Sequence, residues 1–366
     1  MSRLAPTLFD GIRLTIARLY RGTRKNELAK AIGVTPAAIT QYEQGRTRPS
    51  EAVLAALALH LGFPTTFFER GRSASMVSES HVHFRRLRST TKLERDRLLA
   101  RVSLLAELIG EIERHVSLPA ISIPDIPGVG ADDGKAAERA AITVRDLWGL
   151  GSGPIQHVVR LLEGKGVVVV RPAIDTQNVD AFSTLIAGRP IVVLASDKKD
   201  ASRSRMDAAH ELGHLVMHHD AEPGRQTIER EAQRFAAAFL LPRDAMIAEL
   251  PHQVRWDAYL ALKGRWRVSL GALLYRARTV GVLSPDAYQR AQVRMTVRGW
   301  HDDEPGDIGT PEQPTVLFKS LALMEARRGF SARHLAALLH MSIADFESMV
   351  ADIASDTPMR PRLKVV

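Results

Sequence analysis

The sequence has no cysteine among its 366 residues. Disulfide bonds, thiolate metal sites and a cysteine nucleophile are therefore excluded, so any metal ion must be held by histidine and carboxylate side chains. The chain also lacks an apolar run of about 18 residues, which a membrane-spanning helix needs. Its first residues lack the long apolar core and the cleavage site of a signal peptide. We therefore expect a soluble, cytoplasmic protein with no membrane partner and two or three domains.

Acidic residues are scarce in the first quarter of the chain. Residues 1–101 hold 18 Lys and Arg but only 8 Asp and Glu, a net charge of +10, whereas the whole chain carries +9. The other 265 residues therefore carry about −1 in total. Because positive charge gathered at one end favours an anionic partner, the sequence predicts that this end binds nucleic acid. A basic face that merely contacts solvent is the alternative.

Short helices with tight breaks are predicted before residue 70. Gly33 and Gly45 are expected to end helices, while Thr35 and Ser50 are expected to cap the helices that follow them, with Pro36 in the first helical position. Residues 71–80 have the composition of a linker. Apolar residues at helical spacing then predict one long helix from about Thr91 to His115.

The predicted secondary structure becomes mixed α/β after a Pro/Gly-rich boundary near 117–134. Strands rich in β-branched and aromatic residues are expected at 167–171, 180–188 and 190–196. Helices are expected at about 135–149, 154–166, 200–218 and 226–240, with further helices over 243–298, a loop at 301–314 and a last helical segment at 315–352.

The stretch "AHELGH" (209–214) carries the chemistry of a metal site. His210 and His214 lie one helical turn apart, so both imidazoles can reach one ion, while Glu211 can stand beside the ion's water ligand. Such a glutamate takes the proton of the attacking water in zinc hydrolases. The small and apolar residues around the motif favour a buried helix over a surface helix that holds two histidines by chance.

A third ligand is expected from the helix at 226–240. Glu229 and Glu231 flank its apolar face at similar angles, so the helical period does not choose between them, and Glu222 in the preceding loop is a weaker candidate. The strand at 180–188 is our candidate edge strand, to which an extended substrate would pair. Tyr275, Arg276 and His218 are candidates for the group that stabilises the oxyanion.

Two resemblances extend this interpretation. "RMDAAHELGHLVMHH" together with "IEREAQRFAAAFLLP" resembles the ImmA/IrrE family of bacterial metallopeptidases, with further matches at "DAFSTL", "RPIVVLAS" and the Arg203/Arg205 pair. The resemblance implies a minimal gluzincin-like zincin fold that binds one Zn²⁺ per chain, with Glu231 as the third ligand beside His210 and His214, Glu211 as the catalytic residue, and repressor proteins as substrates.

The segment "ELAKAIGVTPAAITQYEQGRTRPS" resembles a Cro/repressor-type (XRE) helix-turn-helix. We expect Ala29 and Gly33 to let its two helices cross closely, with Ile39 packed between them. The second helix would enter the major groove of double-stranded DNA, where Gln41 and Ala37 suit contacts to adenine and to a thymine methyl group. The expected DNA-binding residues are Lys25, Pro36, Ala37, Thr40, Gln41, Arg46 and Arg48.

The whole chain is expected to be α+β and mainly helical. We divide it into a helix-turn-helix domain (1–72), a linker with the long helix (73–134), a metallopeptidase domain (135–300) and a C-terminal helical segment (301–366). The favoured function is a DNA-binding transcriptional regulator with a zinc-dependent endopeptidase domain that cleaves a repressor or itself. The alternative is a non-enzymatic antitoxin or autoregulator whose zinc domain binds a toxin partner or senses a ligand. A homodimer is expected, with the long helix either as its seam or packed on the peptidase domain.

Overall fold

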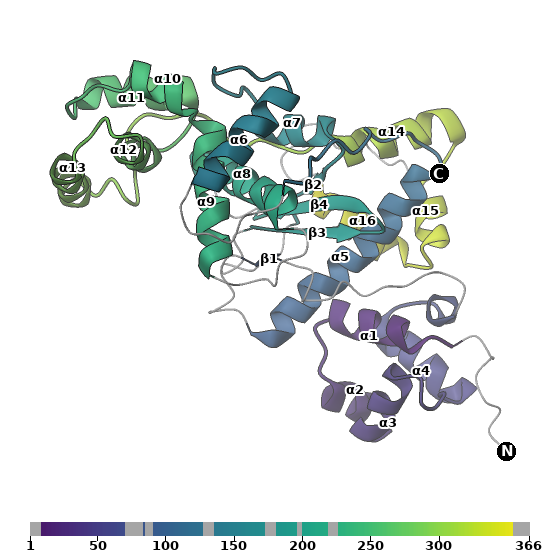
Figure 1. Ribbon diagram of the computed structural model, residues 1–366. Coiled ribbons are helices and arrows are strands. Elements are labelled where there is room, and N and C mark those ends of the chain that lie inside the picture. The colour runs from purple at the N-terminus through teal and green to yellow at the C-terminus, as the bar shows by residue number, and fades with distance from the viewer. Residues whose placement is uncertain are drawn as a thin grey trace.

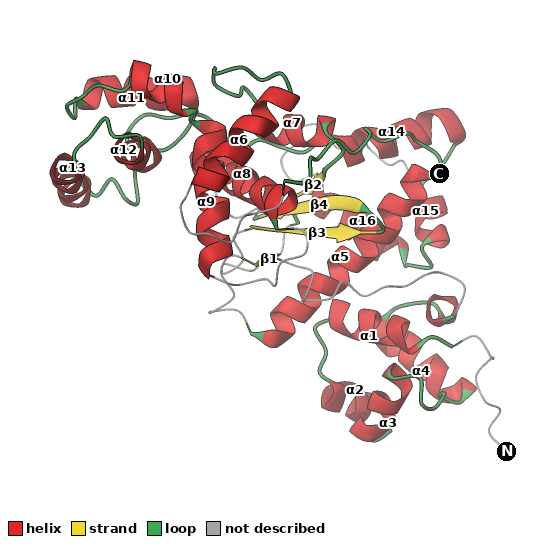
Figure 2. Cartoon of the chain, in the orientation of Figure 1, coloured by secondary structure: helices red, strands yellow, loops and turns green. Residues whose placement is uncertain are grey.

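The computed structural model describes residues 9–69, 83–84, 91–126, 135–172, 181–195, 200–218 and 226–353. Within these ranges the chain is mainly helical around one small sheet, which confirms the expected fold class (Figure 2). The helices are α1 (Gly11–Tyr20), α2 (Lys25–Ile32), α3 (Pro36–Glu43), α4 (Glu51–Leu61), η1 (Thr65–Phe68), α5 (Lys92–Glu113), α6 (Lys135–Leu147), α7 (Val158–Gly164), α8 (Ala201–Met217), α9 (Gln226–Leu240), α10 (Arg243–Glu249), α11 (Trp256–Trp266), α12 (Leu270–Thr279), α13 (Pro285–Val297), α14 (Val316–Arg328), α15 (Ala332–Leu338) and α16 (Ile343–Ile353). The strands are β1 (His83–Phe84), β2 (Val168–Val170), β3 (Ala181–Ile186) and β4 (Arg189–Leu194).

The N-terminal helices begin at the predicted caps. The side chains of Thr35 and Ser50 accept hydrogen bonds from backbone N–H groups of the first turns of α3 and α4. Gly33 does not serve a close helix crossing, because a methyl group there would meet nothing within 4 Å. Its left-handed φ of 71° is what favours glycine. The close approach lies at Gly11, where an added Cβ would stand 2.2 Å from the carbonyl oxygen of Tyr42.

The four strands lie in the order β1-β3-β4-β2. β3 and β4 form an antiparallel hairpin, whose two-residue turn at Ala187–Gly188 has positive φ at both positions, as a hairpin of this length prefers. β2 runs parallel to β4, and β1 runs antiparallel to β3. β3 is therefore an inner strand, so our expectation that it forms the edge is wrong. Its outer side is paired with the two residues of β1, which no periodicity could reveal.

The sheet separates two apolar cores because alternate side chains point to opposite faces. Val169, Ala181 and Val192 join the core formed with α6–α9 and α11–α13, whereas Phe182 and Val193 join the core formed with α5 and the terminal helices. In Figure 1 the sheet accordingly lies between α8 and α5, and α10–α13 form a lobe beyond α9. The sheet and α9 thereby fix α8 from two sides.

The long helix α5 is confirmed, with Thr91 as its cap. Nearly all of its apolar residues are buried within the chain, against α1, the sheet and α14–α16. Among the described residues α5 therefore has no apolar face left for a dimer seam. This supports the interpretation that α5 packs within the chain rather than between two chains. The predicted linker at 71–80 lies outside the described residues. The described part of the chain has no helix that is long and apolar enough to span a membrane.

Candidate metal centre and DNA-binding surface

Helix α8 carries the two motif histidines in a fully buried setting. Asp200 caps its first turn by accepting from the backbone N–H groups of Ser202 and Arg203. Gly213 allows α9 to approach closely, because a Cβ there would lie only 3.1 Å from the Phe235 ring and 3.3 Å from the Cα of Ala232. This crossing brings the first turns of α9 beside the last turns of α8, where His210 and His214 lie.

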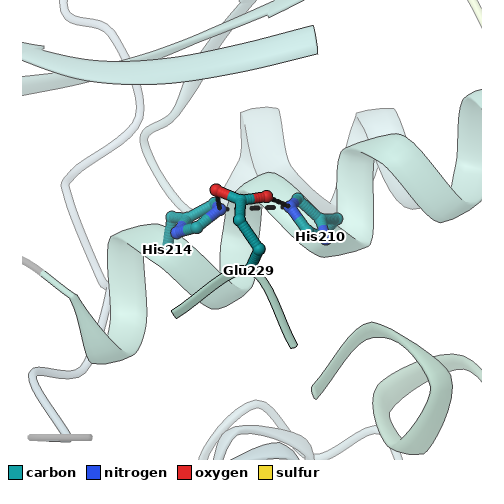
Figure 3. A group of neighbouring side chains, drawn as sticks. All are labelled: His210, His214 and Glu229. Atoms are coloured by element: carbon teal, nitrogen blue, oxygen red, sulfur yellow. Dashed lines mark hydrogen bonds and ion pairs between the residues drawn. The ribbon is translucent and has the colours of Figure 1, made fainter. Parts of the chain in front are cut away.

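His210, His214 and Glu229 meet at one point (Figure 3). The two Nε2 atoms are 3.1 Å apart, and the Glu229 carboxylate oxygens lie 3.3 Å from His210 Nε2 and 3.5 Å from His214 Nε2. Two nitrogens bound tetrahedrally to zinc at about 2.0–2.1 Å would be separated by about 3.3 Å. The imidazole spacing therefore suits a shared ion.

The carboxylate of Glu229 supports the same interpretation. Both of its oxygens are buried, and within the described residues they accept no hydrogen bond although they face two imidazoles. A buried carboxylate normally needs a cation or several donors to offset its lost hydration. Two neutral histidines and one carboxylate form the nitrogen and oxygen donor set that zinc takes in hydrolases, so these residues fit a divalent ion.

Glu231 lies elsewhere, at the end of a relay through His218. His218 Nε2 is 3.0 Å from a Glu231 oxygen, and His218 Nδ1 is 3.1 Å from His214 Nδ1. Burial lowers the pKa of His218, and the Glu231 and Glu229 carboxylates offset only part of this effect. In neutral His218 the Nε2–H donates to Glu231, and Nδ1 accepts from His214 Nδ1–H. This contact directs His214 Nε2 toward Glu229 and His210.

The motif glutamate Glu211 is completely buried and is held by the sheet. Its Oε2 accepts a 2.7 Å hydrogen bond from the hydroxyl of Ser183, a residue of β3. Ser183 shares the sheet face of Ala181, which packs toward α8. Sequence reasoning did not identify Ser183, because its role depends on which face of β3 meets α8.

A buried ionic cluster fixes the start of α8. Glu312, in the loop before α14, pairs with Arg205 and accepts from the backbone N–H of Val159 at 2.8 Å, and His157 Nδ1 lies 3.1 Å away. Burial alone would raise the pKa of Glu312, but the hydrogen bond from His157, the Arg205 charge and the Val159 N–H outweigh it and lower the pKa to about 2. Glu312 therefore stays ionised and ties the loop before α14 to α8, the helix that carries His210 and His214.

The expected DNA-reading side chains mostly face solvent. Pro36, Ala37 and Gln41 are exposed on α3, and Arg46 and Arg48 are exposed in the turn after it. In Figure 1, α2 and α3 lie at the end of the molecule away from the sheet, so this surface is open in the described chain.

Two of the expected DNA contacts are engaged inside the domain. Lys25 Nζ lies 2.9 Å from Glu43 and 3.3 Å from the hydroxyl of Thr40. The Thr40 hydroxyl in turn donates to the carbonyl of Pro36. A phosphate or base would have to compete with these contacts, so Arg46 and Arg48 are better placed for DNA.

Other site candidates are placed less favourably. Arg276 is buried in contacts with Glu138 and the carbonyl of Leu241, so its guanidinium is already engaged away from His210, His214 and Glu229. Glu222, the weaker ligand candidate, lies outside the described residues.

Comparison with known proteins yields two family matches. Residues 11–67 match the model of a helix-turn-helix domain, and residues 162–278 match the model described as the IrrE N-terminal-like domain of a peptidase family. The second match contains α8, α9 and the sheet strands β2–β4. No curated protein is significantly similar to the chain.

Proposed function

Because the chain joins a helix-turn-helix DNA-binding domain to an IrrE-like peptidase-type domain, we propose that it is a transcriptional regulator with a zinc-dependent endopeptidase centre. The observation that carries the proposal is the convergence of His210, His214 and Glu229 beside a buried Glu211 held by Ser183. A helix that only stabilised the fold would gain nothing from placing this many ionisable groups in its buried face.

The residues divide the work of peptide hydrolysis between them. Bound zinc would polarise the substrate carbonyl and acidify a water molecule. Glu211 accepts the proton of that water and delivers it to the departing amide nitrogen, as a general base and then acid. Ser183 keeps one carboxylate oxygen of Glu211 fixed during both transfers. His218 and Glu231 orient His214, as carboxylate–histidine pairs do around metal ions.

We assign Glu229 as the third ligand, whereas the family resemblance points to Glu231. Titration of the metal-free protein with zinc distinguishes them. Glu229→Gln should abolish stoichiometric binding, whereas Glu231→Gln should keep one zinc per chain with an affinity lowered about 10- to 100-fold. The opposite pattern would restore Glu231 as the ligand. Circular dichroism of each variant confirms that loss of zinc is not loss of fold.

Peptidase activity is tested with the zinc-loaded full chain. It should cut members of a peptide library made from digested bacterial protein, and mass spectrometry locates the cuts. Glu211→Gln is the matched control, because it should bind zinc normally but leave the library intact. The natural substrate is proposed to be a repressor, so the same pair should be incubated with the repressor encoded nearest to this gene. Identical product patterns for the two proteins would refute the peptidase.

DNA binding is tested with the promoter region of the protein's own gene. Affinity in a gel shift should fall steeply with salt, because the exposed arginines after α3 replace counterions on phosphates. Gln41→Ala should weaken binding to this region by a factor of about 10 or more while sparing random DNA, since glutamine pairs with a base edge. No shift at low salt would refute the proposal.

A second function is favoured by one observation, the pairing of β1 with the side of β3 where a substrate strand would add. In this alternative the centre does not cut, and the IrrE-like domain binds a toxin partner or senses a ligand within an antitoxin-type regulator. Pull-down with the product of the neighbouring gene tests it, because a stable zinc-dependent complex in which neither chain is cut would favour this alternative. A homodimer on DNA is proposed for either function and is measured by light scattering.

A further inference from the structure

We infer that the chain's own strand β1 (His83–Phe84) occupies the strand position that a peptide substrate would take at the proposed peptidase centre. The inference rests on the proposed function, since it takes β3 as the strand that receives substrate. It concerns the regulation of that centre, because β1 competes with any substrate strand for pairing with β3.

Register is the first support. β1 runs antiparallel to β3, with His83 opposite Ser183 and Phe84 opposite Phe182. Ser183 is also the residue whose hydroxyl holds Glu211. The two paired residues of β1 therefore lie level with the group that would move the proton, rather than at a remote end of the strand.

Topology is the second support. β3 is paired with β4 on its other side, so the side taken by β1 is the one place where an added strand can extend the sheet at β3. β4 is flanked by β2 and β3, so neither of the two strands that pack most closely on α8 offers a bare edge, and the other open side of the described sheet belongs to β2. A peptide that pairs with β3 must therefore displace β1.

The number of paired residues determines how strongly β1 binds to β3. Only two residues of β1 pair, and neighbouring residues of a strand direct their N–H groups to opposite sides, so β1 presents one backbone N–H to β3. Such a contact is weak, but covalent attachment gives it an effective concentration of about a millimolar. The segment should therefore exclude weak peptides and yield to tighter ones.

Proline scanning tests the inference on the full-length Glu211→Gln chain, which cannot cut. Proline removes one N–H, so of His83→Pro and Phe84→Pro only one should break the ladder, and the other is its matched control. The breaking variant should show faster hydrogen exchange in a mass-spectrometric peptide covering β3. It should also bind a fluorescent peptide of residues 78–90 about tenfold more tightly than the parent does. A scrambled peptide should gain nothing.

Unchanged exchange and unchanged peptide affinity in both proline variants would overturn the inference. Equal gains for the native and the scrambled peptide would overturn it as well, since they would mean general loosening of the domain. Neither readout requires catalysis. The proposed peptidase can therefore fail in its own assay while this result stands, and the peptidase can succeed while β1 is shown not to occupy the substrate position.

Discussion

Replacing Glu312 by glutamine should destabilise the peptidase-type domain at neutral pH far more than it does in acid. The Glu312 side chain is 2% exposed and is surrounded by Arg205, His157 and the Val159 N–H. Its pKa falls from 4.5 to about 2 on folding, a change of about 2.5 pH units. At about 1.4 kcal/mol per unit, the charge on Glu312 stabilises the folded chain by about 3 kcal/mol.

An independent argument gives a similar magnitude. Removing the charge leaves Arg205 buried without its counter-ion, and burial already lowers the pKa of Arg205. Breaking a buried ion pair by removing one partner typically costs about 3–5 kcal/mol. Glutamine keeps the size and one acceptor of glutamate, so the expected loss lies near the lower end, about 3 kcal/mol.

The stabilisation by Glu312 should decrease as the pH falls. Because folding depresses the pKa, the stabilisation is complete above the unfolded pKa and fades as pH falls from about 5 toward 2. The difference between parent and Glu312→Gln should thus shrink by about 1.4 kcal/mol between pH 7 and about pH 3.5. Urea unfolding followed by tryptophan fluorescence suits the measurement, because all four tryptophans lie between 148 and 300.

Asp257→Asn is the matched control. Asp257 is an exposed carboxylate paired with an exposed arginine, so its loss should leave the urea midpoint in place. If Glu312→Gln unfolds at the parent's urea concentration at pH 7, or if the difference stays constant into acid, the charge of Glu312 does not hold the loop to α8.

Three further predictions test other parts of the structure. Ser183→Ala should lower the kcat of the proposed peptidase about 10- to 150-fold, because a hydrogen bond to a charged group is lost. Thr184→Val, next to it on β3, should not lower kcat, since the buried Thr184 hydroxyl has no hydrogen-bond partner in the described chain. Equal kcat values for the two variants would contradict the positioning role of Ser183. Gly11→Ala should destabilise the helix-turn-helix domain by about 2 kcal/mol or more, because the added Cβ would lie 2.2 Å from the Tyr42 carbonyl oxygen. Hydrogen exchange of residues 11–67 measures this loss of stability. Unchanged protection would show that α1 and α3 can move apart. Arg46→Ala should reduce the slope of log affinity for DNA against log salt by about one, and an unchanged slope would place Arg46 away from phosphate.

The helices and their ends could be predicted because local chemistry decides them. Thr35, Ser50 and Thr91 are capping residues at the start of apolar periodic segments, and each accepts from the first turn of its helix. Helical spacing likewise predicts the apolar face of α9, on which Ile228, Ala232, Phe235 and Phe239 are all buried. In these cases the interacting groups are at most a few turns apart in the chain.

The choice of metal ligand shows where local chemistry stops. Glu229 and Glu231 flank the same apolar face, and their helical angles alone are equally compatible with a site. What separates them is the crossing of α8 and α9 at Gly213, which turns Glu229 toward the two imidazoles and Glu231 toward His218. The crossing angle depends on the packing between two helices, so it cannot be predicted from the sequence of one helix alone.

Long-range pairing explains the other differences. β1 has two residues, too few for any alternation, and it pairs with β3 across about a hundred positions of sequence. Glu312 lies in a polar, Pro-containing stretch whose composition predicts a solvent-exposed loop. It is nevertheless buried, because it contacts Arg205 and His157, which lie 107 and 155 positions earlier in the sequence. Charge complementarity between distant segments leaves no periodic trace in either one.

The segments outside both family matches are what join the two domains physically. α5 and α14–α16 share one apolar core with the helix-turn-helix domain and with one face of the sheet. Polar contacts add to it, since Arg13 of α1 pairs with Glu107 of α5, and Arg21 makes a two-point pair with Asp345 of α16. The connection that contains β1 is therefore not the sole tether of the DNA-binding domain. Displacing β1 would free that side of β3 while this core still held the helix-turn-helix domain in place, so occupancy of the proposed centre and the position of that domain are separable in this fold.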